Sequence, residues 1–259
     1  MQRTEKIGLR FAGLTDVGRS RTHNEDNYKL VPDHDLFIVA DGMGGHASGE
    51  VASELAVVSV ADFIEISAQD SETTWPFKED RSQSYAFNLL GVAIQLANRR
   101  IFETGMATPK CKGMGTTIVG MMFNENEGYV GHVGDSRAYL IANNQIEQLT
   151  EDHSLLNDYL KTHALTPEEI EAFPHKNVIV RALGIQAKIQ VDVQRLALSA
   201  GNLYVMCSDG LSGLISDDEI FQLASQHADD LDRGCQVLID AANQRGGTDN
   251  ITVVMVAVE

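Results

Sequence analysis

Short apolar runs alternate with polar turns along most of the chain. The runs are five to eight residues long, and most are bounded by Gly, Asp or Asn, as strands of an antiparallel sheet are. The segments NENEG (124–128) and ANNQ (142–145) are typical of hairpin turns. We therefore predict strands at residues 36–40, 116–123, 129–133, 137–142, 189–196, 203–207 and 251–258.

Four longer stretches carry apolar residues at a spacing near 3.6, which predicts amphipathic helices. In the first stretch this spacing is set by Val51, Leu55, Val58 and Phe63. The four predicted helices cover residues 48–66, 84–103, 216–226 and 230–244.

Strands joined by hairpins and helices kept in separate blocks predict an α+β fold, in which helices cover a sandwich of antiparallel sheets. No tandem repeat or low-complexity linker interrupts residues 1–259, so we expect a single domain. The polar segment 152–178 has a helix start at Thr166 and no strand pattern. We expect it to be an insertion on the surface, and we predict a loop at 69–81.

Composition narrows the class of protein. The chain has 259 residues, 43% of them hydrophobic, which is enough for a real core and excludes disordered and fibrous classes. It carries 20 basic against 37 acidic side chains, a formal net charge of −17. Such a surface repels nucleic-acid phosphates and anionic lipid, so we expect neither nucleic acid nor membrane as a partner. Divalent cations are the natural counter-charge.

The cysteines and the N-terminal residues bear on the compartment. Cys111, Cys207 and Cys235 are widely spaced and form no CxxC or Cys/His pattern, which is typical of reduced thiols. The first residues, MQRTEKIGLRFAG, show no apolar core of a signal peptide. No apolar stretch approaches the roughly 20 residues that span a bilayer. We therefore expect a cytoplasmic protein.

Two similar segments, FIVADGMGG (37–45) and YVMCSDGLSG (204–213), point to chemistry. Each runs from an apolar strand into Asp-Gly, which places Asp41 and Asp209 on rigid supports. The glycine after each aspartate lets the backbone approach whatever the carboxylate binds. A single Asp-Gly is more often an ordinary turn. Two of them, each after a predicted buried strand, favour a shared site.

Three further acidic motifs supply the rest of a cluster: RTHNEDN (21–27), GHVGDSRAYL (131–140) and GGTDNITVV (246–254). Each places a carboxylate at the end of a predicted element, where side chains converge. Carboxylates gathered in this way repel one another, and a divalent metal relieves the repulsion. Because all the candidate ligands are oxygens, Mg²⁺ or Mn²⁺ is favoured over Zn²⁺. Two such ions can activate a water and clamp a phosphoryl group, whose oxygens a guanidinium binds bidentately.

These motifs, in this order, resemble those of the protein phosphatase 2C family in its compact bacterial form. RxxNED, ADGMGGHxxGExAS, GTT, GDSRxYL, LTxDHS, RALG, SDGLxG and GGxDNxT stand at family-like spacing from about Gly13 to Val258. The resemblance implies a central antiparallel β-sandwich with helix pairs on both faces, a four-layer α-β-β-α arrangement. It also implies that segment 152–178 is the family's variable flap, which lies beside the site.

The resemblance implies a binuclear metal centre with the following ligands. Asp41 bridges the two ions, and the carbonyl of Gly42 completes the second site. Asp209 and Asp249 hold the first ion. Glu25 binds the second ion or orients its waters. The cofactors are then two Mg²⁺ or Mn²⁺ ions.

Further roles follow from the same resemblance. Arg21 binds the substrate phosphate, and Asp26 hydrogen-bonds to water at the metals. Asp135, together with Asp209, makes a third, weaker metal site. Asn250 supports its neighbour Asp249. His46 either protonates the departing alkoxide or is a solvent-facing residue at a helix start.

The function implied is a metal-dependent protein serine/threonine phosphatase that opposes a serine/threonine kinase in signalling and acts on phosphorylated proteins as a monomer. Three alternatives stay open: a dedicated regulator of an anti-sigma pathway, a non-catalytic phosphoprotein-binding protein, and acidic turns that only confer solubility. No cysteine is followed by Arg at the sixth position, and neither GDxHG nor GxxxxGK[ST] occurs. Other phosphatase chemistries and nucleotide use therefore lack support. We interpret His23, His132 and His153 as structural.

Overall fold

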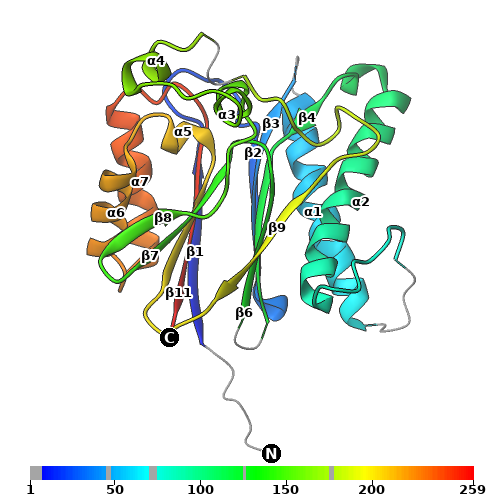
Figure 1. Cartoon of the computed structure of the whole chain (residues 1–259), viewed down its shortest axis with the longest axis horizontal. Coiled ribbons are helices and arrows are strands. Elements are labelled where there is room, and N and C mark those ends of the chain that lie inside the picture. Colours follow the sequence, from blue (N-terminus) through cyan, green and yellow to red (C-terminus); the bar gives the residue numbers. More distant parts are fainter. Residues whose placement is uncertain (1–7, 45–47, 70–74, 125–126, 175–177) are drawn as a thin grey trace, which may run out of the picture.

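Two antiparallel sheets lie face to face at the centre of the computed structural model, which describes residues 8–44, 48–69, 75–124, 127–174 and 178–259 (Figure 1). The first sheet has the strand order β1-β11-β10-β7-β8 and the second β2-β3-β5-β6-β9, with β4 paired to β3. The strands of the first sheet are β1 (Leu9–Asp16), β11 (Ile251–Val258), β10 (Leu203–Cys207), β7 (Arg137–Ala142) and β8 (Gln145–Gln148). Those of the second are β2 (Asp26–Val31), β3 (Leu36–Met43), β5 (Ile118–Asn124), β6 (Glu127–Val133) and β9 (Asp192–Ala197), and β4 is Gly115–Thr116.

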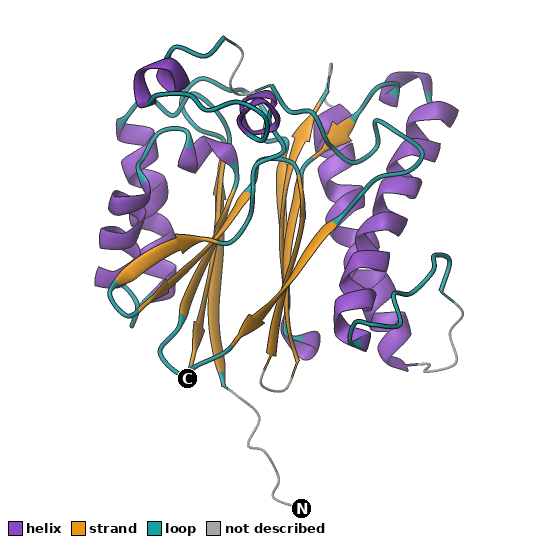
Figure 2. Ribbon diagram, viewed as in Figure 1, coloured by secondary structure: helices purple, strands orange, loops and turns teal. Residues whose placement is uncertain are grey.

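Helices cover the outer face of each sheet, so the protein has four layers (Figures 1 and 2). The long helices α1 (Ser48–Gln69) and α2 (Tyr85–Ala107) pack on the second sheet. On the first sheet lie α5 (Asp209–Ser212), α6 (Asp217–Gln226) and α7 (Leu231–Gln244). Single 3-10 turns are η1 (Pro32–His34) and η2 (Pro109–Cys111). The predicted α+β sandwich with flanking helices is confirmed.

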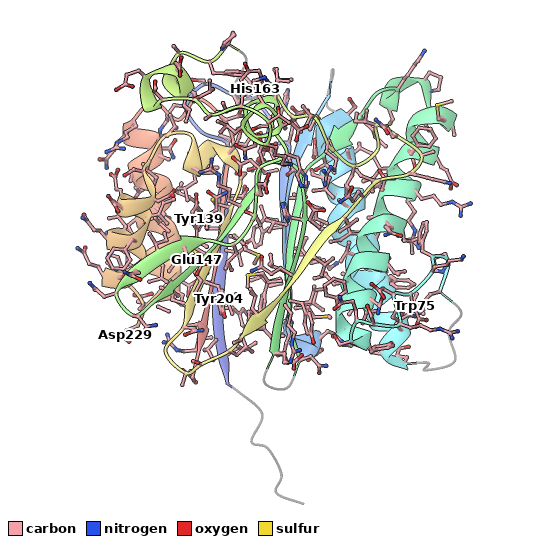
Figure 3. The ribbon with its side chains drawn as sticks, viewed as in Figure 1. Trp75, Tyr139, Glu147, His163, Tyr204 and Asp229 are labelled. Carbon is pink, nitrogen blue, oxygen red and sulfur yellow. The ribbon has the colours of Figure 1, made fainter. Side chains whose placement is uncertain are left out.

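Both faces of the central strands are buried, which explains their continuous apolar runs. In β3, Phe37 and Val39 face the gap between the sheets, whereas Leu36, Ile38 and Ala40 face the helices. Three apolar clusters result, one between the sheets and one beneath each helical layer. Tyr204 belongs to the central cluster, Tyr139 to the cluster under α6 and α7, and Trp75 packs against the cluster under α1 and α2 (Figure 3).

Side chains at the N-termini of the helices cap the first backbone N–H groups. Ser84 caps α2, with its hydroxyl accepting the Phe87 N–H at 3.2 Å. Asp230 caps α7 by accepting the Arg233 N–H at 3.1 Å. The predicted helices are confirmed, although α1 continues to Gln69 and α2 to Ala107.

The prediction misses some strands and shifts others. Strands β1, β2 and β8 are absent from the predicted set because their polar residues hide the alternation; β1 includes Arg10, and β2 reads DNYKLV. The run predicted as a strand from Ile189 begins only at Asp192, where pairing with β6 starts. Residues 75–84 form neither helix nor strand, in agreement with the predicted loop; 70–74 lie outside the described residues.

Segment 152–178 contains two short helices, α3 (Leu155–Leu160) and α4 (Pro167–Glu171). They lie over the end of the sandwich at which α5 begins (Figure 1). Ser154 forms an isolated antiparallel bridge with Ile179, so the two ends of the segment are held together. None of the helices in the described part of the chain is both long and apolar enough to cross a membrane.

Candidate metal centre and active site

The acidic motifs converge at one end of the sandwich. Asp26 begins β2 and is paired in register with Asp41 on β3. Asp209 begins α5, two residues after the end of β10, Asp249 precedes β11, and Asp135 lies in the turn between β6 and β7. Asp41 feels the charges of the other four carboxylates, and this repulsion adds to desolvation in raising the pKa of Asp41 well above its usual range. The structure therefore brings the five predicted aspartates together.

Asp41 is fixed through its backbone. Its N–H donates to Thr117 Oγ1 at 3.0 Å, and its carbonyl accepts from Thr116 Oγ1 and from the Thr117 N–H, both at 2.8 Å. The following residue can only be glycine, because a Cβ on Gly42 would lie 2.1 Å from the Gly49 carbonyl oxygen. The strand thus presses against the start of α1, and the Gly42 N–H donates to the Glu25 carbonyl at 3.1 Å.

Asp26 is 4% exposed, and its two carboxylate oxygens differ in their hydrogen bonds. Its Oδ2 accepts from the hydroxyls of Ser208 and Thr252, both at 2.7 Å. Among the described residues, its Oδ1 has no hydrogen-bond partner. Burial raises the pKa of Asp26 to about 7, the two hydroxyl bonds oppose this rise, and the charges of Asp209 and Asp249 add to it.

Asp135 and Asp209 line a polar cleft of about 340 Å³. Asp135 is 7% exposed, and its Oδ1 also lacks a hydrogen-bond partner in the described part of the chain. Desolvation and the neighbouring Asp209 charge raise the pKa of Asp135 to about 7. The pKa of Asp209 is raised by burial and by Asp249, against a hydrogen bond with Asp41 that lowers it. Segment 152–178 also lines the cleft, through Asp152, Ser154, Leu156, Asn157 and Ile170.

Asn250 connects the last acidic motif to the first. Its Oδ1 accepts the Glu25 N–H at 2.8 Å, and its Nδ2 donates to the carbonyls of Val17 and His23, both at 2.9 Å. The side chain of Glu25 lies against α1, since a Cβ on Gly49 would be 2.6 Å from Glu25 Oε1. The Asn250 side chain therefore supports the loop that carries Glu25, and its backbone N–H donates to Asp249 Oδ1 at 2.9 Å.

Arg21 reaches the cluster from its solvent side. Its Nη2 lies 2.7 Å from Asp249 Oδ2, and 48% of the Arg21 side chain is exposed. Within the described residues, Asp249 is the one aspartate of the cluster with an ion pair. The guanidinium is thus positioned where it can reach both the cluster and a ligand that arrives from solvent. His46 lies outside the described residues.

The donor set fits hard divalent cations. All five aspartates offer oxygen, and among the described residues Asp26 and Asp135 each keep a buried Oδ1 without a partner. Burial, with added repulsion from neighbouring carboxylates, raises the pKa values of Asp26, Asp41, Asp135 and Asp209. A divalent ion supplies the missing partner and removes the repulsion. No His or Cys of the described residues joins this cluster, which agrees with Mg²⁺ or Mn²⁺ and not Zn²⁺.

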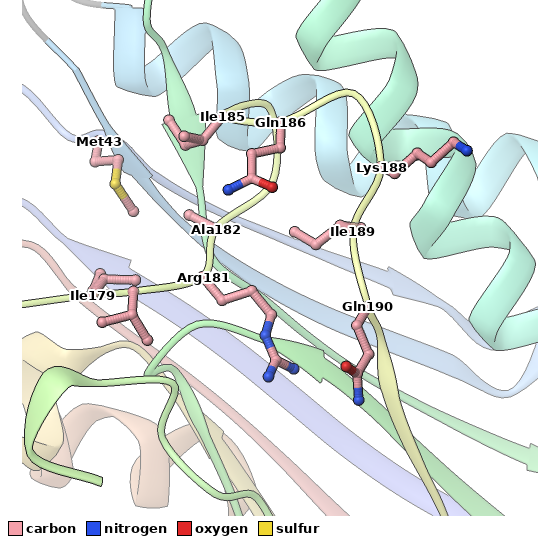
Figure 4. A pocket seen from close by; sticks show the side chains of 10 residues that line it. Met43, Ile179, Arg181, Ala182, Ile185, Gln186, Lys188, Ile189 and Gln190 are labelled. Carbon is pink, nitrogen blue, oxygen red and sulfur yellow. The ribbon is translucent and has the colours of Figure 1, made fainter. Parts of the chain in front are cut away.

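A second pocket, of about 470 Å³, opens beside the exit of β3 (Figure 4). Met43, two residues after Asp41, forms part of its wall, and Ile179, Ile185 and Ile189 supply further apolar surface. Basic groups at Arg181 and Lys188 border it (Figure 4). The pocket is tied to Asp41 through β4, because Thr116 pairs with both Gly42 and Leu183.

Several polar residues that hold the site have no predicted role. Ser208 and Thr252 bind Asp26, and the Arg137 guanidinium forms a bidentate pair with Asp152, with Nη2 to Oδ2 at 2.7 Å. All four belong to the motifs SDG, DNIT, GDSR and EDHS. Their position inside the motifs indicates that these residues belong to the site. Their hydrogen-bond partners lie 15 to 226 positions away in the sequence, so no local pattern predicts the contacts.

Comparison with known proteins agrees with this geometry. Residues 17–246 match the family described as protein phosphatase 2C. The chain is 37% identical over 250 residues to the serine/threonine phosphatase stp of Listeria welshimeri, with 93% of each protein covered.

Solved structures with the same fold include the serine/threonine phosphatase PstP/Ppp of Mycobacterium tuberculosis, at a TM-score of 0.84 and 32% identity, covering 98% of this chain and 99% of that one. The catalytic domain of PstP in complex with two manganese ions has a TM-score of 0.81 and 31% identity, covering 97% and 98%. With the family match spanning most of the chain, this protein belongs to the protein phosphatase 2C family of serine/threonine phosphatases.

Proposed function

We propose that this protein hydrolyses phosphoserine and phosphothreonine in phosphorylated proteins, with water as the nucleophile, at a centre of two Mg²⁺ or Mn²⁺ ions. The observation that carries the proposal is the cluster of Asp26, Asp41, Asp135, Asp209 and Asp249 at one end of the sandwich. Two buried oxygens of this cluster lack a hydrogen-bond partner among the residues that the structure describes. The manganese ions of the related PstP domain support the choice of metal.

The ligand assignment follows the convergence of the motifs. Asp41 and the carbonyl of Gly42, Asp209, Asp249 and Glu25 would hold the two ions. Asp135, which shares the 340 Å³ cleft with Asp209, would hold a third, weaker one. When bound, such ions lower the pKa of water and neutralise phosphate charge.

The chain's own residues then bind and orient the substrate. Arg21, exposed and paired with Asp249, exchanges part of that ion pair for a bidentate contact with the phosphate oxygens. Asp26, held by Ser208 and Thr252, keeps its free Oδ1 available to orient the attacking water. Attack on phosphorus breaks the ester bond, and the serine or threonine oxygen leaves with a proton that His46 would supply. No side-chain nucleophile is needed.

The wider assignments belong to the same proposal. Residues 1–259 form one phosphatase domain, in which segment 152–178 is a flap that walls the cleft and selects substrates. The protein acts as a cytoplasmic monomer. A serine/threonine kinase produces its phosphoprotein substrates and is the enzyme that it opposes in signalling.

Oxygen-18 water and rapid acid quench test the one-step reaction. With a radiolabelled phosphothreonine peptide and Mn²⁺, we expect one solvent oxygen in each released phosphate and no radiolabel on the protein. An acid-stable phosphoprotein at early times would contradict direct attack by water. Tight binding of the peptide without any release would favour the non-catalytic binding protein instead.

A further inference from the structure

His132, His153 and Asp192 form a second cluster of titratable groups outside the aspartate centre. Their ligand atoms lie within 4.8 Å of one another, and both imidazoles are buried. The two rings are stacked, with centroids 4.7 Å apart. His132 Nε2 is bonded to the Glu151 carbonyl at 2.9 Å. The residue types are those of a metal site, but the contacts within the cluster indicate a structural role.

A guanidinium already supplies the positive charge in this cluster. Arg181 Nη1 lies 3.2 Å from Asp192 Oδ2 and 3.1 Å from His153 Nε2. A metal ion at these atoms would have to displace Arg181. Gln190 Nε2 donates to the other oxygen, Asp192 Oδ1, at 3.2 Å. Asp192 is therefore fully engaged by groups of the protein itself.

His153 also binds the peptide groups on both sides of Gly134, the residue before Asp135. The Gly134 N–H donates to His153 Nδ1 at 3.0 Å, and the His153 backbone N–H donates to the Gly134 carbonyl at 2.9 Å. Since Nδ1 accepts, the proton of the neutral ring is on Nε2, which donates to Asp192 Oδ2 at 2.9 Å. Arg181 Nη1 and His153 Nε2 then both carry protons and cannot bond to each other. Arg181 therefore donates its hydrogen bond to Asp192 Oδ2.

The glycine at this point needs an external restraint. Gly134 has φ +111°, and a Cβ would lie 2.6 Å from the Thr117 side chain, so no other residue fits. Glycine gives the turn no conformational preference of its own. Loss of the His153 acceptor would leave the buried Gly134 N–H unsatisfied and let the Val133–Gly134 peptide rotate, which moves the turn that carries Asp135.

We propose that His153 is a positioning residue for the metal centre: it fixes the Gly134–Asp135 turn, and the Asp192–Arg181 pair holds its ring in the required tautomer. This inference rests on the proposed function, because Asp135 is there a metal ligand. The chain of contacts ends at the pocket of Figure 4, whose wall includes Arg181. It therefore links a surface that adjoins the flap to a ligand in the cleft.

Two substitutions separate the contacts of the ring. His153→Asn retains an acceptor at the place of Nδ1 and loses the contact with Asp192, whereas His153→Gln places its amide at Nε2 and loses the acceptor for Gly134. Asp192→Asn keeps the ring and removes the charge that orients it. His227→Asn, on the far side of the first sheet at the end of α6, is the control. Each protein is first checked for folding by circular dichroism.

Calorimetric titration of metal-free protein with Mn²⁺ is the main readout, and kcat and KM on a phosphothreonine peptide are the second. We expect His153→Gln to weaken one Mn²⁺ binding event about 10- to 100-fold and to lower kcat with KM nearly unchanged. His153→Asn should restore Mn²⁺ binding to within about threefold of wild type, and Asp192→Asn should lie between the two. The control should match wild type.

Wild-type Mn²⁺ binding in folded His153→Gln would overturn the proposal, as would equal loss in the Asn and Gln variants. If His153→Gln does not fold, the other two variants decide: Asp192→Asn should bind Mn²⁺ more weakly than His153→Asn. Equal affinities or the reverse order would overturn the proposal. Weakened Mn²⁺ binding in a protein that never releases phosphate would leave the positioning role standing and refute the phosphatase proposal. A wild type that binds no Mn²⁺ would overturn both.

Discussion

Asp26 and Asp41 lie directly opposite each other on the paired strands β2 and β3, where two like charges destabilise a sheet. Burial and the charge of Asp26 raise the pKa of Asp41 well above its usual range. Within the described residues, Asp26 Oδ1 has no hydrogen-bond partner. No requirement of the fold explains this arrangement, since apolar residues at these positions would pack without repulsion. A cluster of like charges that costs the metal-free protein stability is typical of a site that binds cations.

Metal should therefore stabilise the protein more at high pH. The pKa of Asp26 and that of Asp135 are raised from 3.8 to about 7, so between pH 4 and 7 the metal-free folded state binds more protons than the unfolded state. The contribution of these groups to stability is thus lost as pH rises through this range. We expect Mn²⁺ to raise Tm more at pH 8 than at pH 5.5, relative to EDTA.

Scanning calorimetry at the two pH values measures this difference. Desolvation lowers the pKa of His132 and that of His153, which gives a loss of stability on acidification in both metal-free and loaded protein. Comparing the Mn²⁺-induced shift, and not Tm itself, removes that common effect. An equal shift at both pH values would contradict the role of the carboxylates.

Asp41→Asn and Asp209→Asn should separate activity from stability. Each removes one of the repelling charges, so the metal-free variant should fold with Tm equal to or above that of wild type. Turnover should fall by at least about 100-fold. Asp229→Asn, which changes an exposed aspartate away from the cluster (Figure 3), is the matched control and should retain full activity. Retained turnover in Asp209→Asn would refute the metal assignment.

Arg21→Ala should act on substrate binding. The lost contacts to phosphate correspond to roughly 1.5 kcal/mol, so KM should rise about tenfold with a smaller change in kcat. Stability should change little, because the Arg21–Asp249 pair is largely exposed. Steady-state kinetics with a phosphothreonine peptide measures this, with Arg99→Ala on the exposed surface of α2 as control. An unchanged KM would exclude Arg21 from phosphate binding.

Gly42→Ala tests the close contact between β3 and α1. The new methyl group would lie 2.1 Å from the Gly49 carbonyl oxygen, and neither backbone can yield easily. We expect a loss of about 3 kcal/mol in the free energy of unfolding. Gly91→Ala is the control, since its Cβ would meet only Val193 Cγ2 at 3.4 Å and alanine favours the helix. Similar denaturant midpoints for the two variants would contradict the packing described.

The sequence predicts elements whose two faces are both buried, such as β3, β10 and β11, because their apolar runs are continuous. It does not reveal β1, β2 or β8, which are recognised only by their partners: Leu9–Asp16 pairs with β11 across more than 230 residues of sequence. The same holds for the site. The motifs predict which aspartates belong to the site. The hydrogen bonds that Thr252 donates to Asp26 and that the Gly134 N–H donates to His153 arise from tertiary contacts alone.

Phosphate release from a phosphothreonine peptide decides whether the reaction depends on metal at the aspartate cluster. Wild type and Asp209→Asn are compared in EDTA and after readdition of Mn²⁺ or Mg²⁺. We predict no release in EDTA, release by wild type when either metal returns, and release by the variant that is at least about 100-fold lower with either metal. Release by wild type in EDTA, or equal release by the variant, would contradict a reaction that depends on metal held by the aspartate cluster.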